Sequence, residues 1–137
     1  GFRERTLKAK AIPQSQDTLF FLITNPEKVV FEQAIELHKK LSSFNLSSAG
    51  VIINRVAKEI PLSPQERSRL SQLKEKNMEP ILTIFDAFRQ LALREKEQIN
   101  IFKKALPPST PMYEIPSFDE EIYDIKGLNL INLHLFR

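Results

Sequence analysis

The sequence has 137 residues, of which 42% are hydrophobic and 27% charged, and its formal net charge is +3. This is the balance of one globular domain, and no apolar run approaches the roughly 18 residues that a membrane span requires. The absence of cysteine excludes a disulfide framework, a thiolate nucleophile and a cysteine metal site, and it fits a reducing, cytoplasmic compartment.

The first residues have neither an initiator methionine nor a signal peptide, so we expect a fragment or excised domain. Residues 1–12 carry apolar side chains among charges and predict a helix or the end of one, before a turn over residues 13–17.

Two apolar runs rich in β-forming residues, 18–24 and 49–56, predict strands buried on both faces, as in a parallel sheet. Between them, Asn25 is the expected N-cap of a helix over 26–44. The apolar face expected for this helix comprises Val30, Ala34, Leu37 and Leu41. The predicted unit over 18–56 is therefore βαβ, and the fold class is α/β, a partial parallel three-layer sheet.

A long helical segment is predicted over 63–105, beginning with a capping box formed by Ser63 and Glu66 around Pro64. Pro80 lies inside it and predicts a kink or two separate helices, arranged as an antiparallel hairpin or a projecting arm. The apolar face expected for this segment comprises Leu70, Leu73, Ile81, Ile84, Phe88, Leu91 and Phe102.

The remainder, 110–137, predicts a third strand over 110–115, a loop over 116–119 and a weak helix ending near Leu135. We take 1–137 as one α/β unit. Common catalytic motifs are absent: there is no G-x-x-x-x-G-K-[ST] loop, no H-E-x-x-H, no EF-hand loop and no G-x-S-x-G. His38 and His134 have no partner at metal-ligand spacing, so no metal site is predicted.

The pair Asn54-Arg55 ends a predicted buried strand, the place where ligands bind in open α/β sheets. An asparagine amide can pair with the N6 and N7 edge of adenine. The alternative is a loop-capping asparagine beside a surface arginine.

A second strand exit, Ile115-Pro116-Ser117, is followed by Phe118, and a proline with an aromatic ring there could pack on a base. The alternative is an ordinary strand exit. Nucleic-acid binding rests only on the basic pI, since no basic stripe is interleaved with aromatic residues.

Together these features resemble the arsenical pump-driving ATPases and the related targeting factors for tail-anchored membrane proteins, which are deviant-Walker P-loop ATPases. The resemblance rests on the order and spacing of several stretches along nearly the whole chain. They are Phe2-Arg3-Glu4-Arg5, residues 18–27 with Glu32, residues 50–56, Arg94, Gln98, Glu114-Ile115-Pro116, Glu121 and Gly127-Leu128.

The resemblance implies that this is the carboxyl-terminal part of such an ATPase. It implies that Asn54 and Arg55 lie at the adenine of ATP, with Ile115, Pro116 and Ser117 in the loop that closes over the base. The phosphate-binding loop and the Mg-coordinating residues would belong to the amino-terminal part of the same ATPase, so this chain would not hydrolyse ATP alone.

The implied partners are that amino-terminal part, a second copy in a homodimer, and a membrane-protein client or pump subunit. The chain departs from the family where the targeting factors carry a C-x-x-C zinc site, because it has no cysteine. Tyr123-Asp124 also stands where many members have Arg-Gly. The rival hypothesis is a non-enzymatic interaction module in which segment 63–105 binds a partner helix in a groove.

Overall fold

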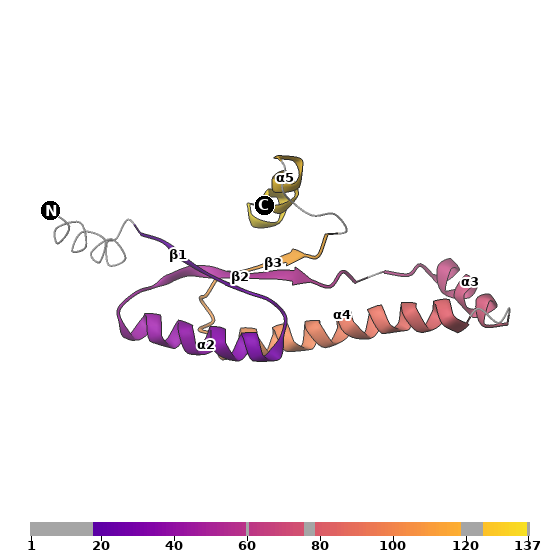
Figure 1. Cartoon of the computed structure of the whole chain (residues 1–137), viewed down its shortest axis with the longest axis horizontal. Coiled ribbons are helices and arrows are strands. Elements are labelled where there is room, and N and C mark those ends of the chain that lie inside the picture. Colours follow the sequence, from indigo (N-terminus) through magenta and orange to yellow (C-terminus); the bar gives the residue numbers. More distant parts are fainter. Residues whose placement is uncertain (1–17, 60, 76–78, 119–124, 137) are drawn as a thin grey trace.

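The computed structural model describes residues 18–59, 61–75, 79–118 and 125–136, so the expectations for residues 1–17 and 119–124 lie outside it. Within these ranges the chain forms a parallel three-stranded sheet in the order β1-β2-β3 (Figure 1). The elements are β1 (Phe20–Thr24), α2 (Lys28–Ser43), β2 (Ser48–Val56), α3 (Pro64–Glu75), α4 (Glu79–Ala105), β3 (Met112–Pro116) and α5 (Ile125–Leu135). The predicted α/β class with a long helical segment is confirmed.

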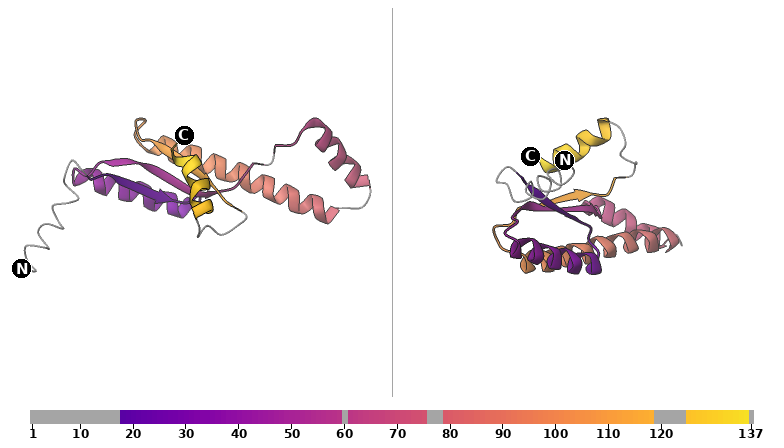
Figure 2. Two further views of the ribbon diagram at one scale, coloured as in Figure 1. Left: turned by 90° about the horizontal axis from the view of Figure 1, so that it is seen from above. Right: turned by 60° about the vertical axis from the view of Figure 1, so that its left-hand side comes forward.

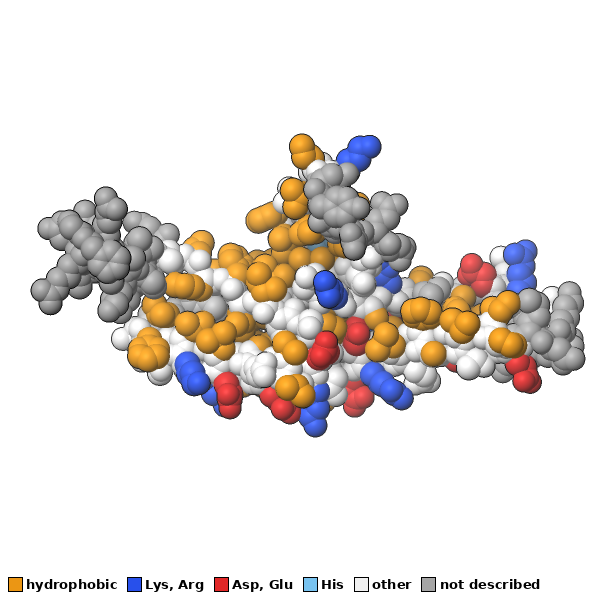
Figure 3. Space-filling view, in the orientation of Figure 1, with side chains coloured by type: hydrophobic (Ala, Val, Ile, Leu, Met, Phe, Trp, Pro, Cys, Tyr) orange, Lys and Arg blue, Asp and Glu red, His pale blue; other side chains and the backbone are white. Residues whose placement is uncertain are grey.

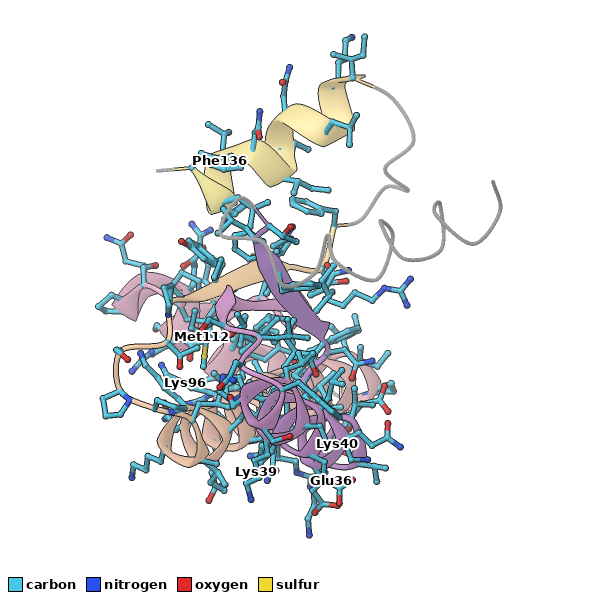
Figure 4. All side chains as sticks on the ribbon, turned by 90° about the vertical axis from the view of Figure 1, so that its left-hand side faces the viewer. Glu36, Lys39, Lys40, Lys96, Met112 and Phe136 are labelled. Atoms are coloured by element: carbon cyan, nitrogen blue, oxygen red, sulfur yellow. The ribbon has the colours of Figure 1, made fainter. Side chains whose placement is uncertain are left out.

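Helices lie on both sides of the sheet, but unequally. α2 and α4 run side by side beneath it, whereas α5 lies on the opposite side, against β3 (Figures 1 and 2). Figure 4 shows Glu36, Lys39 and Lys40 along the outer side of α2, and Phe136, which follows α5, on the opposite side of the sheet.

The main core lies between the sheet and the two helices beneath it. Val51 and Ile53 of β2 are fully buried, and Phe102 of α4 is 1% exposed. The ring of Phe102 stacks on that of Phe31 in α2, with centroids 4.3 Å apart and planes 10° apart. Burial of these side chains is the main favourable term that holds α2 and α4 under the sheet.

The start of α2 differs from the prediction. The N-cap is Glu27 rather than Asn25, and the helix begins at Lys28. Asn25 instead forms a turn before the helix, because its Oδ1 accepts a hydrogen bond from the Glu27 backbone N–H and its Nδ2 donates to Glu27 Oε1, both at 3.3 Å. Asparagine is suited to such a local turn as well as to an N-cap.

The buried face of α2 also differs in part from the prediction. Phe31 and Ala34 are its buried residues, Val30 and Leu41 are half-buried, and Leu37 is 47% exposed. The helix is rotated from the predicted face because Phe31 stacks on α4, a contact that helical spacing within α2 does not indicate.

α2 ends in a left-handed residue. Asn45 has φ 57°, its N–H donates to the carbonyl of Ser42, and the N–H of Leu46 donates to the carbonyl of Leu41. This is the Schellman arrangement, in which a left-handed residue after the helix lets two backbone N–H groups cap its last carbonyls.

The α3–α4 segment is a hairpin of two separate helices, as predicted from Pro80. The capping box is confirmed: Ser63 N–H donates to Glu66 Oε2 at 2.8 Å, and Glu66 N–H donates to Ser63 Oγ at 3.2 Å. The Ser63 backbone and hydroxyl donors lower the pKa of Glu66. Pro80 lies in the first turn of α4, where its missing N–H costs no intrahelical hydrogen bond.

Most of the predicted apolar face of α4 is exposed to solvent. Phe102 is buried, but Ile81, Ile84, Phe88 and Leu91 are exposed. α4 has 27 residues and is about 40 Å long, whereas the nine-residue β2 spans about 30 Å. Figure 2 shows that the amino-terminal half of α4 extends past the sheet together with α3, as a projecting arm.

β1 is covered on one face only, which corrects the prediction of strands buried on both faces. Leu22 and Thr24 are buried toward α2, whereas Phe21 and Ile23 are exposed. In the part of the chain that the structure describes, the only helix on that side is α5, and it packs on β3. Figure 3 shows hydrophobic side chains gathered where α5 rises from the sheet.

Candidate functional site

The carboxyl ends of β2 and β3 lie side by side and bring the sequence-predicted site residues together. Val56 is paired with Pro116, and the N–H of Ser117 donates to the carbonyl of Val56 at 2.8 Å. Asn54-Arg55 and Ile115-Pro116-Ser117, about 60 positions apart in sequence, are thus neighbours at one edge of the sheet. Ligands of open α/β sheets bind at this edge.

A bulge in β2 separates Asn54 and Arg55 from the regular ladder. Ile53 is paired with Glu114 and Val56 with Pro116, so Asn54 and Arg55 together face the single residue Ile115. Arg55 has φ 59°, in the left-handed region that a branched or long side chain rarely adopts. Bulges and such conformations re-aim side chains and are concentrated at binding sites.

The Asn54 side chain is exposed and only partly used within the protein. Its Oδ1 accepts a hydrogen bond from the Arg55 backbone N–H at 3.0 Å. Its Nδ2 has no hydrogen-bond partner among the described residues. One donor group and the second lone pair of Oδ1 therefore remain for a ligand.

The three predicted residues of the β3 exit are placed differently from one another. Ile115 is 5% exposed, so its side chain belongs to the packing of the sheet. Pro116 is half-buried and Ser117 is exposed. Phe118 lies under Lys58, whose Nζ is 5.7 Å from the ring centroid, and its ring is tilted against that of His134. The exposed parts of this exit are thus Ser117 and one side of Pro116.

A comparison with protein families identifies the family of this chain. The family model described as anion-transporting ATPase matches residues 3–103. This chain belongs to the anion-transporting ATPase family. The match runs from before β1 almost to the end of α4 and includes Asn54 and Arg55, whereas β3 and α5 lie beyond it. A comparison with curated proteins finds no match.

In this family member, a pocket of about 400 Å³ lies next to the two strand ends. Of the five predicted site residues, Pro116 alone lines it; Asn54, Arg55, Ile115 and Ser117 do not. Its lining is Val56, Ala57, Glu59, Ala92, Lys96, Ile99, Asn100, Glu114, Pro116 and His134. Asn54, Arg55 and Ser117, which are exposed, therefore form an open edge beside the pocket.

Two residues of α4 that sequence reasoning missed hold the chain after β2. Glu95 Oε2 accepts a hydrogen bond from the Ala57 backbone N–H at 2.6 Å, and Lys96 Nζ lies 2.8 Å from Glu59 Oε1. The hydrogen bond that Lys96 donates to the Glu59 carboxylate raises the pKa of Lys96. The Ala57–Glu95 partners are 38 positions apart and the Lys96–Glu59 partners 37. Opposite charge was the only sequence signal for the ion pair, and there was none for the bond to the Ala57 backbone.

No group of three or more His, Asp or Glu residues in the described ranges could hold a metal ion. Likewise, no described helix combines the length and apolar content needed to cross a bilayer.

Proposed function

We propose that this chain forms the adenine-binding edge of an ATP site in an ATPase of the anion-transporting family. The observation that supports it most is the bulge at the end of β2. It presents the Asn54 amide, with Nδ2 available, beside the exit of β3 at Pro116 and Ser117. The family match adds that a nucleotide is the expected ligand class.

The residues present suit the base end of ATP. An asparagine amide can donate to N7 of adenine through Nδ2 and accept from its N6 amino group through Oδ1. The half-buried ring of Pro116 offers an apolar contact for a base face. We assign no role to the Ile115 side chain beyond packing.

The sequence does not contain a loop for the phosphate end of ATP. The 137 residues contain three glycines and no G-x-x-x-x-G-K-[ST] loop, the element whose backbone N–H groups cradle phosphates. We therefore propose that the phosphate-binding loop and the Mg ligands come from another part of the ATPase, and that hydrolysis requires that part.

The test is nucleotide affinity in the complete ATPase. Asn54→Ala should weaken ATP binding about 5- to 150-fold, the equivalent of ~1–3 kcal/mol for a lost bidentate pair. GTP affinity should change little, since the amide is matched to adenine. Asn129→Ala, which removes an exposed asparagine of α5, is the control. Equal ATP affinities in the two variants would overturn the proposal.

A second candidate function, binding of a partner helix, is suggested by a stripe of exposed apolar side chains on α4. Ile81, Ile84, Phe88 and Leu91 are all exposed, and their spacing of three, four and three residues places them on one helix face. Such a stripe is suited to pack against an apolar or amphipathic helix of a client or pump subunit.

Serine substitutions test whether the apolar stripe, and not another face of α4, binds a partner helix. Ile84→Ser and Phe88→Ser should weaken binding of an apolar helical peptide, whereas Gln90→Ser, on another side of α4, should not. Equal binding in the three variants would contradict an interaction role for the stripe.

A further inference from the structure

One peptide group immediately after the β2 bulge is held from both sides. The carbonyl of Val56 accepts the hydrogen bond from Ser117 N–H at 2.8 Å, and the N–H of the same peptide group, on Ala57, donates to Glu95 Oε2 at 2.6 Å. The first bond comes from the exit of β3 and the second from the middle of α4. Together they fix the plane of this peptide group.

The bond to Glu95 is of the strong kind. Its acceptor is a carboxylate, its length is short, and both groups are half-buried, so water competes with it only in part. It is also long-range. Most side-chain hydrogen bonds among the described residues join positions four or fewer apart, whereas this one joins positions 38 apart.

The held peptide group begins at Val56, the residue that follows the strained Arg55. Arg55 has φ 59°, a left-handed conformation that is unfavourable for a residue with a Cβ. Such a conformation persists only where the surroundings impose it. The hydrogen bonds of Ala57 to α4 and of Val56 to the exit of β3 hold the backbone on this side of the bulge. They oppose a shift of β2 into a regular register with β3.

We propose that Glu95 is a positioning residue for the adenine-binding edge. It does not touch the ligand; its carboxylate fixes the Val56–Ala57 peptide group, and through it the bulge that presents Asn54. This inference rests on the proposed function. Through Glu95, α4 would influence how tightly the adenine-binding edge binds a base, and α4 is also the helix that carries the exposed apolar stripe.

The experiment compares ATP and GTP affinities of the complete ATPase carrying Glu95→Ala, Glu95→Gln or Glu97→Ala. Glu97 is an exposed acid two positions along α4, so its variant matches the change in charge and helix propensity. Glu95→Ala should weaken ATP binding about tenfold and reduce the preference for ATP over GTP. Glu95→Gln should restore most of the affinity, because its amide oxygen can accept the same hydrogen bond.

The double variant Asn54→Ala/Glu95→Ala separates positioning from general stability. If Glu95 acts through Asn54, adding Glu95→Ala to Asn54→Ala should weaken ATP binding no further. A full additional loss in the double variant, or a loss in Glu95→Ala no larger than in Glu97→Ala, would overturn the role of Glu95 while leaving that of Asn54 intact. An unchanged affinity in Asn54→Ala would instead overturn the proposed function, and the positioning role with it.

Discussion

Truncation of Phe102 tests the packing of α4 most directly. Its ring is 1% exposed and stacks on Phe31 at 4.3 Å. Complete truncation of a buried phenylalanine costs about 3–5 kcal/mol, because apolar contact is lost and a cavity remains. A domain has only about 5–15 kcal/mol of stability, so Phe102→Ala approaches the limit of folding. Phe102→Leu keeps most of the apolar volume and should cost about 1–2 kcal/mol, including the lost ring contact.

The matched control lies on the same helix. Phe88 is 60% exposed, so Phe88→Leu removes almost no buried contact and should change the free energy of unfolding by less than about 0.5 kcal/mol. Urea denaturation followed by circular dichroism measures both variants. A loss in Phe88→Leu equal to that in Phe102→Leu would refute the conclusion that the first half of α4 extends beyond the core.

A double-mutant cycle isolates the ring contact itself. Phe31→Leu and Phe102→Leu should each lower the free energy of unfolding, and the double variant should lose less than their sum by about 0.5–1.5 kcal/mol. Strict additivity would mean that the two rings contribute separately, through burial alone.

Three further predictions concern local features. Gly50→Ala places a Cβ 3.0 Å from the Pro111 carbonyl oxygen and 3.2 Å from Tyr113 Cε2 and should lower the free energy of unfolding by about 1–3 kcal/mol; a gain would show that both the backbone and the ring give way. Asn45→Gly should raise it by about 0.5 kcal/mol, since glycine adopts the left-handed conformation at no steric cost, and Asn45→Ala should lower it. Because the pKa of Glu66 is lowered by Ser63, its contribution is present at neutral pH and is lost as the pH falls through the folded-state pKa. The difference in stability between wild type and Glu66→Gln should therefore shrink from pH 7 to pH 3.

Features that depend on neighbouring residues were predictable from the sequence. The strands β1 and β2 begin within two residues of their predicted positions, because each is a continuous apolar run bounded by polar residues. The capping box at Ser63 and the break before Pro80 follow from the chemistry of a few adjacent positions. The juxtaposition of Asn54 with Pro116 follows once both strands are assigned to one parallel sheet.

Features that depend on distant residues were not predictable. Leu37 and Phe31 both suit an apolar helix face, and only the ring of Phe102 in another helix decides which is buried. The apolar stripe of α4 has the spacing of a core face, but the sheet ends before it does. The hydrogen bond from Ala57 to Glu95 spans 38 positions, and no local pattern indicates it.

The reach of α4 has a mechanical consequence. Its inner half is fastened under the sheet by Phe102 and to the strand exit by Glu95, whereas its first residue, Glu79, lies about 24 Å farther along the axis than Glu95. A stiff rod of that length acts as a lever. A tilt of about 5° at the fastened end displaces the free end by about 2 Å, comparable to the helix shifts of allosteric transitions. Conversely, a partner that binds the free end of α4 and tilts the helix would displace Glu95 relative to the Ala57 N–H.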